Sequence, residues 1–119
     1  MGNPVVHWEI NAKDGKKLRE FYGSLFDWKI DTNNPMDYGM VDTGGEGREG
    51  KIDGGIGQAE EGTPSYVTFY VQVPDLQAHL DKAEKLGGKT VLPPTEIPNV
   101  VTIAMFQDPE GNFIGLLKG

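Results

Sequence analysis

The sequence of 119 residues contains no cysteine. This absence excludes thiol catalysis, cysteine-ligated zinc sites and iron–sulfur clusters, and it fits a reducing compartment. Long apolar runs are missing as well: no stretch approaches the roughly 20 apolar residues of a membrane span, and the first residues do not follow a signal-peptide pattern. We therefore expect a cytoplasmic protein that does not enter a membrane.

Basic residues are also few. Eleven Lys and Arg face 18 Asp and Glu, which gives a formal net charge of −7. The basic residues are scattered along the chain, whereas binding to a phosphate backbone requires them in clusters. The sequence therefore predicts no nucleic-acid partner.

One pattern occurs twice along the chain. Alternating apolar and polar residues from Val5 are followed by Asp14 as a helix cap, and then by an apolar helical face made of Leu18, Phe21, Tyr22 and Leu25. The same order returns with alternation over residues 66–73, Asp75 as the cap, an apolar face of Leu76, Leu80 and Ala83, and a stop at Gly87-Gly88. This repetition indicates two related modules.

Three strand-like segments follow each predicted helix: "WKIDT", "YGMVDT" and "KIDGGIGQ" in the first module, and "KTVLP", "VVTIAMF" and "NFIGLLK" in the second. The predicted fold class is α+β, with two paired βαβββ modules and eight mostly antiparallel strands. We expect a single domain of residues 1–119, with module one at 1–57, a connector at 58–65 and module two at 66–119.

Three stretches carry a resemblance that covers essentially the whole chain: "HWEINAKDGKKLREFY", "FYVQVPDLQAHLDKAEKLGGK" and "FQDPEGNFIGLL". In this order and at these separations they resemble the vicinal oxygen chelate superfamily, which includes glyoxalase I, bleomycin-resistance-type binding proteins and extradiol dioxygenases. The resemblance implies sheets that curve around a cavity shared by the two modules.

The resemblance also implies four metal-ligand positions in metal-using members, one on the first strand and one on the last strand of each module. On this sequence they fall on His7, on Thr68, on Gly115 and near Gly54 or Gly55. Only His7 offers a metal ligand, and divalent transition metals need several convergent donors. We therefore expect no firmly held cofactor, with a divalent metal at His7 as the alternative.

Side chains alternate along a strand, so parity assigns the cavity face. Glu9 shares the face of His7, while Trp8 and Ile10 turn to the helix layer. On the other module Phe69, Val71 and Val73 turn to the helix layer. The predicted ligand contacts are His7, Glu9, Thr68, Tyr70, Gln72, Phe113 and Leu117, with glycine at 115 enlarging the cavity.

His7 and Glu9 are the candidate catalytic residues, as a base and a carboxylate that orients it. Each has a plain alternative: a strand imidazole bonded to backbone or water, and a solvated rim carboxylate. His79 on the second helix is expected at the surface or at its boundary.

The stretch "GEGREG" at residues 45–50 matches a dinucleotide-binding pattern literally. That motif functions where it opens a helix after a strand, and here a strand-like run follows it. We interpret it as a loop that could act as a lid.

These observations favour a glyoxalase/bleomycin-resistance-like protein that binds a small organic molecule. The alternatives are a lyase, isomerase or dioxygenase of the same superfamily that uses His7 as a metal ligand or base, and an interaction module with a vestigial cavity. A homodimer is the expected assembly.

Overall fold

The computed structural model describes residues 2–34, 36–44 and 51–119 of the chain. The predicted loop and lid at 45–50 lie outside these residues. Within the described part, no helix is long and apolar enough to cross a membrane.

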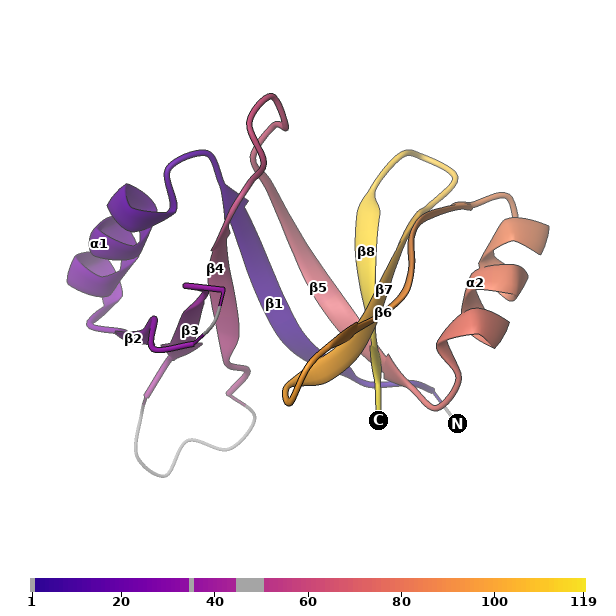
Figure 1. Cartoon of the computed structure of the whole chain (residues 1–119), viewed down its shortest axis with the longest axis horizontal. Coiled ribbons are helices and arrows are strands. Elements are labelled where there is room, and N and C mark those ends of the chain that lie inside the picture. Colours follow the sequence, from indigo (N-terminus) through magenta and orange to yellow (C-terminus); the bar gives the residue numbers. More distant parts are fainter. Residues whose placement is uncertain (1, 35, 45–50) are drawn as a thin grey trace. The chain divides into compact units, whose positions relative to one another are not determined.

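The described residues form two helices and eight strands, in the order βαβββ–βαβββ (Figure 1). The first set is β1 (Val5–Ala12), α1 (Gly15–Phe26), β2 (Lys29–Asp31), β3 (Gly39–Asp42) and β4 (Gly54–Gln58). The second set is β5 (Tyr66–Val73), α2 (Leu76–Lys85), β6 (Lys89–Ile97), β7 (Val101–Gln107) and β8 (Phe113–Lys118). The strands make an eight-stranded mixed sheet, so the predicted α+β class with repeated βαβββ order is confirmed.

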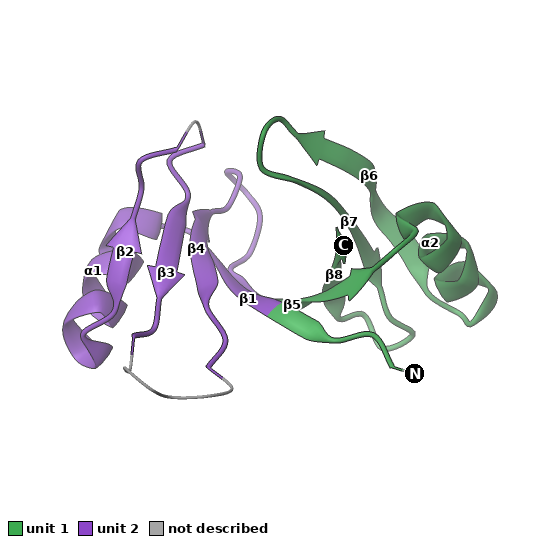
Figure 2. Ribbon diagram, turned by 90° about the horizontal axis from the view of Figure 1, so that it is seen from below, with its two compact units in different colours: residues 1–6, 68–119 green, residues 7–67 purple. Residues whose placement is uncertain are grey.

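Contacts divide the chain into two compact units, which are residues 7–67 and residues 1–6 together with 68–119 (Figure 2). We call them the first half and the second half. The first two residues of β1 belong to the second half and the rest of the strand to the first. Whether the halves act as a single domain with a separate connector stays a prediction.

In the first half the strand order is β2-β3-β4-β1. β1 and β4 are parallel, whereas β3 is antiparallel to both β2 and β4. Ala12, Val41 and Ile56 form the buried centre, and side chains of β1 and α1 pack around it, including Trp8, Ile10, Leu18 and Tyr22. Trp8 and Ile10 therefore face the helix layer, as parity predicted.

The apolar stripe predicted for α1 is only half correct. Leu18 and Tyr22 pack on the core, but Phe21 and Leu25 are 56% and 57% exposed. Residues four apart lie one above the other on a helix, so Leu18 and Tyr22 make a narrow line of contact with the sheet. Phe21 and Leu25 lie beside that line and stay outside the core.

In the second half the strand order is β5-β8-β7-β6, with β5 parallel to β8 and the other neighbours antiparallel. Val73, Leu76, Leu80, Ala104 and Leu116 form its buried core, and Val71 packs against it. The prediction that Phe69 packs in the helix layer is wrong, because its side chain is 40% exposed. α2 makes its extensive contacts with β6, β7 and β8 rather than with the part of β5 that contains Phe69.

Both helices begin as the sequence predicted. The carboxylates of Asp14 and Asp75 accept hydrogen bonds from the backbone N–H groups of Lys17 and Ala78, at 3.1 and 3.0 Å. Such a bond satisfies one of the N–H groups that the first turn of a helix leaves open. At the end of α2, Gly87 takes a φ of 103°, which favours glycine and stops the helix.

The turn before β8 is held by the Asp108 carboxylate. It accepts hydrogen bonds from the backbone N–H groups of Glu110 and Asn112 and from the Asn112 side chain, each at 2.9 Å. These bonds, led by the one from the Asn112 side chain, lower the pKa of Asp108. The turn fixes where β8 begins and so places Phe113 and Gly115 beside β5.

Candidate functional site

Tyr38 joins the two residues that the sequence singled out on β1. Its hydroxyl donates a hydrogen bond to Glu9 Oε1 at 2.9 Å and lies 3.1 Å from His7 Nε2. The His7 and Tyr38 rings are stacked at 26°, with centroids 6.3 Å apart. His7 and Glu9 therefore both contact one phenol, which lies between them.

A missing side chain makes room for this phenol. Gly55 on β4 is paired with Glu9, and a Cβ atom built on Gly55 would overlap the Tyr38 hydroxyl and ring. Tyr38 itself is held by Asn34, whose amide donates to the Tyr38 carbonyl at 2.7 Å and whose carbonyl accepts from the Tyr38 N–H at 2.9 Å. Asn34 thus holds the segment before β3 so that the Tyr38 ring lies beside Gly55 on β4.

The surroundings of His7 favour its neutral form. Burial lowers the pKa of His7 below its ordinary value of 6.5, and the charge of Asp53 opposes this shift. A neutral imidazole has one nitrogen that donates and one that accepts, so it can bind a polar ligand or take up a proton. Glu9 also influences Tyr66 at the start of β5, because burial, and then the charge of Glu9, raise the pKa of the Tyr66 hydroxyl.

His7 borders an open groove of about 460 Å³ in the first half. This volume lies within the range of small-molecule sites. Residues of β1, β2, β3 and the start of β4, together with Asp53 just before β4, line it: His7, Lys29, Ile30, Asp31, Met40, Val41, Asp42, Asp53 and Gly54.

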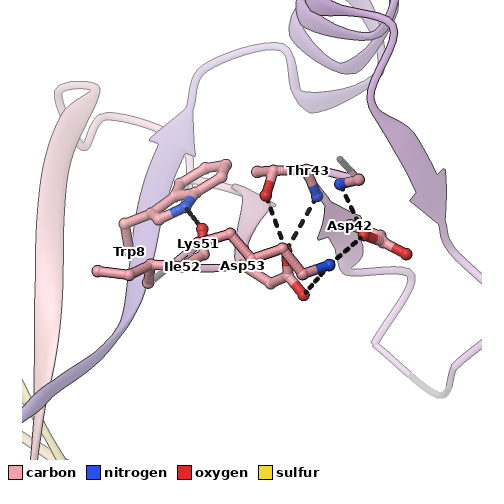
Figure 3. A network of polar contacts seen from close by, with 7 residues as sticks. Trp8, Asp42, Thr43, Lys51, Ile52 and Asp53 are labelled. Carbon is pink, nitrogen blue, oxygen red and sulfur yellow. Dashed lines mark hydrogen bonds and ion pairs between the residues drawn. The ribbon is translucent and has the colours of Figure 1, made fainter. Parts of the chain in front are cut away.

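Two of the groove's carboxylates belong to a polar network (Figure 3). Lys51 lies 3.0 Å from Asp42 and 3.6 Å from Asp53 and forms ion pairs with both. Hydrogen bonds from the backbone N–H groups of Gly44 and Thr43 are the main causes that lower the pKa of Asp42 and of Asp53, respectively. Ionised Asp53 is therefore fixed near His7.

The indole of Trp8 anchors the same segment from the helix side, by donating to the Ile52 carbonyl at 2.7 Å (Figure 3). Gly54 also approaches Trp8 closely, since a Cβ on Gly54 would overlap the indole ring. Gly54 and Gly55 thus make space on opposite faces of β4, one for Trp8 and one for Tyr38.

The second half repeats the bare strand position. Gly115 on β8 is paired with Tyr70 on β5, and a Cβ on Gly115 would overlap the Tyr70 ring. Tyr70 is 5% exposed. The register Tyr70–Gly115 matches the register Glu9–Gly55, so Gly55, rather than Gly54, corresponds to Gly115. The sequence predicted that glycine at 115 would enlarge a cavity, but a tyrosine ring fills the space beside this glycine.

The other predicted contacts of the second half have defined surroundings. Thr68 is 4% exposed, and its hydroxyl donates to the Phe113 carbonyl at 2.6 Å. The Gln72 side chain lies against the backbone of Gly119, and Gln72 is paired with Leu117. Phe113 and Leu117 are partly buried. His79 on α2 is partly buried, and its Nδ1 is 3.0 Å from the Asp75 carbonyl.

Comparisons with known proteins agree with this fold. The family model described as Glyoxalase/Bleomycin resistance protein/Dioxygenase superfamily matches residues 5–116. The chain belongs to this superfamily. A relative from Didymella fabae, a glyoxylase-like domain-containing protein, is 31% identical over 108 residues, which is 87% of this chain and 84% of the relative.

A second superfamily relative comes from Mycobacterium tuberculosis, where it is named "Putative glyoxylase CFP32". It is 30% identical over 113 residues, or 91% of this chain. The chain spans 42% of the length of that protein. Among solved structures, a superfamily member from Vibrio splendidus 12B01 aligns with a TM-score of 0.63 and 17% identity, over 99% of this chain and all of that one.

Four positions correspond to the metal ligands that the resemblance implies for metal-using members. They are His7, Gly55, Thr68 and Gly115, so that one imidazole is joined by a hydroxyl and two glycines. The Nε2 of His7 is engaged by Tyr38, and the Thr68 hydroxyl by a carbonyl. In the described part of the chain no three His, Asp or Glu side chains lie together as a metal-binding group.

Sequence reasoning missed Tyr38. It directly precedes β3 and lies outside the strand, and alternation within strands says nothing about the direction of a residue outside a strand. Gly55 was the available signal, because a strand glycine often marks a close approach by another group.

Proposed function

We propose that the protein binds a small organic molecule on the His7 face of its first half, without a tightly held metal. The main support is that a tyrosine ring fills the space beside each of two strand glycines. Tyr38 fills the space beside Gly55, and Tyr70 fills the space beside Gly115, which are the positions where metal-using relatives are expected to place ligands. A groove of about 460 Å³ that is lined by the His7 imidazole and by the carboxylates of Asp31, Asp42 and Asp53 suits an organic ligand with polar groups.

The predicted contacts on the second half, Thr68, Tyr70, Gln72, Phe113 and Leu117, are a separate part of this proposal. Among them, Gln72, the neighbour of Leu117 in register, has an amide that supplies both a donor and an acceptor.

Metal content and ligand stabilisation test the proposal together. Elemental mass spectrometry of untagged wild type and of His7→Ala should find far less than one divalent ion per chain in both. A panel of polar organic compounds should include some that raise the melting temperature in the presence of EDTA, since a ligand that binds only the native state stabilises it. Stoichiometric metal in wild type that is lost in His7→Ala would overturn the proposal.

An enzyme is the second candidate, supported by the surroundings of His7. Its lowered pKa leaves the imidazole neutral near pH 7, which is the form that accepts a proton. A lyase or isomerase reaction with His7 as general base and Glu9 as its carboxylate partner through Tyr38 fits this geometry. Such an activity should be lost in His7→Ala while the melting temperature changes little.

We propose further that the protein is a homodimer in the cytoplasm that binds neither nucleic acid nor membranes. Two-fold homodimers are the commonest assembly, and exposed Phe21 and Leu25 on α1 offer apolar surface. Sedimentation analysis at micromolar concentration should give about twice the mass of one chain. A single-chain mass at that concentration would contradict it.

A further inference from the structure

Phe21 and Leu25 give α1 an apolar face that the core does not use. Their side chains are 56% and 57% exposed, whereas phenylalanine and leucine are among the residues most often buried. Residues four apart lie one above the other on a helix, so exposed Lys17 continues the same line towards the start of α1. We call Lys17, Phe21 and Leu25 together the α1 patch. Contiguous exposed apolar surface of this kind marks sites of contact with another molecule.

The phenylalanine of the α1 patch is held in place by other rings. Phe21 meets Tyr22 edge on with centroids 5.0 Å apart, and Tyr22 stacks on Trp28 at 5.8 Å. Tyr22 and Trp28 in turn pack against the buried centre of the first half. A ring that is already fixed loses little conformational freedom when a partner covers it, which favours its use as the anchor of an interface.

α2 does not repeat the patch, although it occupies the same place in the second module. Aligned on the two capping aspartates, α2 has Lys82 and Leu86 where α1 has Phe21 and Leu25. A charged side chain thus replaces the aromatic anchor, and the exposed leucine stands there without it. The α1 patch is therefore a property of the first helix rather than of the repeated order βαβββ.

The charges of α1 run against its dipole. The first turn after Asp14 contains Lys16 and Lys17 but no acidic residue. The last turn contains no basic residue, and the helix ends at Asp27. A helix dipole favours negative charge near its start and positive charge near its end, and α2 follows this rule with two lysines in its last turn. Among the described residues the ion pairs are those of Lys51, so the charges at both ends of α1 are open to a partner.

A second copy of α1 in the opposite direction would satisfy both ends. Lys17 lies one turn before Phe21 and Leu25 one turn after it, about 6 Å away along the axis in each case. If two antiparallel helices cross at Phe21, Lys17 of each copy lies level with the last turn of the other. Its ammonium group then meets the carbonyl groups that a helix end leaves open, and the Asp27 carboxylate beside them. Within one chain Lys17 and Asp27 lie about 15 Å apart along the helix axis and cannot pair.

We propose that the α1 patch binds the α1 patch of a second copy of this chain, with the two helices antiparallel about a two-fold axis near Phe21. This interface is the contact surface of the homodimer proposed above and rests on that proposal. A two-fold pair brings the same surface of each copy together, which requires a patch that complements itself. The α1 patch does so, since its apolar centre meets apolar side chains and its basic start meets an acidic end. A membrane fits less well, because a chain with a net charge of −7 is repelled by anionic headgroups.

The dissociation constant of the dimer, measured by sedimentation velocity over a dilution series, tests the patch. Phe21→Ser and Leu25→Ser should each raise it by about tenfold or more, because buried apolar anchors carry much of the binding energy of an interface. Leu86→Ser is the matched control, since it removes a leucine that is 70% exposed at the corresponding place of α2. This variant should leave the dissociation constant unchanged.

The outcomes separate this interface from the homodimer itself. A dimer that persists unchanged in Phe21→Ser and Leu25→Ser, or that Leu86→Ser weakens as much, would overturn the interface and leave the homodimer standing. A single-chain mass for wild type at micromolar concentration would refute both. Melting temperatures and circular dichroism show that the variants remain folded. If Phe21→Ser does not fold, Leu25→Ser decides alone, since its side chain is not part of the ring cluster.

A double-mutant cycle tests the antiparallel direction. Lys17→Gln and Asp27→Asn each remove one charge, and asparagine tolerates the positive φ of 59° at position 27. Each should weaken the dimer several-fold at low ionic strength. The double variant should be weaker by much less than the product of the two effects, because both remove the same pair. Since the two residues cannot pair within one chain, strictly independent effects, or no effect of either, would overturn the antiparallel arrangement.

The absence of cysteine permits a direct test of proximity. Ser24→Cys introduces one exposed thiol at the edge of the α1 patch, and Lys85→Cys introduces one at the corresponding position of α2. A bismaleimide should join two copies of Ser24→Cys in high yield and two copies of Lys85→Cys several-fold less. Adding Phe21→Ser to Ser24→Cys should abolish the product. Equal yields from the two single variants would place the contact elsewhere and overturn the interface.

Discussion

The ring of Tyr70 occupies the space that a side chain at position 115 would need. Gly115→Ala should therefore destabilise the protein by about 1–3 kcal/mol, which is typical of overpacking a filled site. Urea unfolding followed by circular dichroism measures the change. Gly23→Ala in α1 is the control, because the nearest atoms to its new methyl would be 3.6 and 3.7 Å away and the helix gains propensity.

A double-mutant cycle assigns the cause. In a Tyr70→Ala background the ring is gone, so Gly115→Ala should cost much less than it does in wild type. Equal costs in the two backgrounds would show that the strand itself, rather than the ring, requires glycine.

The buried imidazole of His7 predicts a dependence of stability on pH. Its folded-state pKa is lowered below 6.5, so the unfolded chain binds more protons once the pH falls below that value. Its contribution is fully present above pH 6.5 and is lost as the pH falls through the folded-state pKa. The urea concentration at the unfolding midpoint should decrease as the pH is lowered from 7.5 to 5.5, and this decrease should be smaller in His7→Gln.

His79→Gln is the matched control for that experiment, because it replaces the other histidine of the chain, which lies on α2. Its urea midpoint should follow wild type across the same pH range. A fall that is identical in all three proteins would assign the pH dependence to other groups.

The sequence located His7 and Glu9 on one face because strand periodicity determines faces. It could not locate Tyr38, since this residue lies outside the strands and its phenol occupies the space that a side chain at Gly55 would need. Whether a glycine leaves a cavity or admits a neighbour depends on three-dimensional packing. For Gly115 that neighbour is Tyr70, directly opposite in the parallel pair.

At the scale of elements, the caps of the two helices carry a prediction of their own. Asp75→Ala removes the acceptor of the Ala78 N–H group and should destabilise the protein by about 1 kcal/mol. Asp75→Asn keeps a side-chain oxygen and should retain most of the stability. Urea unfolding of the three proteins decides, and equal losses in both variants would speak against capping as the cause.

Most elements could be predicted from the sequence, since caps, stops and periodicity act locally. The wrong predictions concern residues whose burial depends on whether a neighbouring helix packs over them. Phe21 and Leu25 fit a helical stripe, yet α1 uses the line of Leu18 and Tyr22. Phe69 fits a strand face, but α2 packs over β6, β7 and β8.

At the scale of the molecule, the repeated order βαβββ gives each half its own sheet order and its own core. In each half the first strand pairs in parallel with the last, at the same register relative to the helix cap. The repeat was visible in the sequence because both modules carry the same local signals. The sequence did not show which side chains lie beside Gly55 and Gly115. Tyr38 comes from the segment before β3, whereas Tyr70 comes from β5.

The positions of the two tryptophans determine which part of the protein fluorescence can follow during unfolding. Both tryptophans, Trp8 and Trp28, lie in residues 7–67, with their rings 5.2 Å apart. Indole fluorescence therefore observes the unfolding of the first half alone, whereas far-ultraviolet circular dichroism observes both. If the two halves unfold as one cooperative unit, the two signals will follow the same curve; if they unfold separately, fluorescence will show only one of two steps.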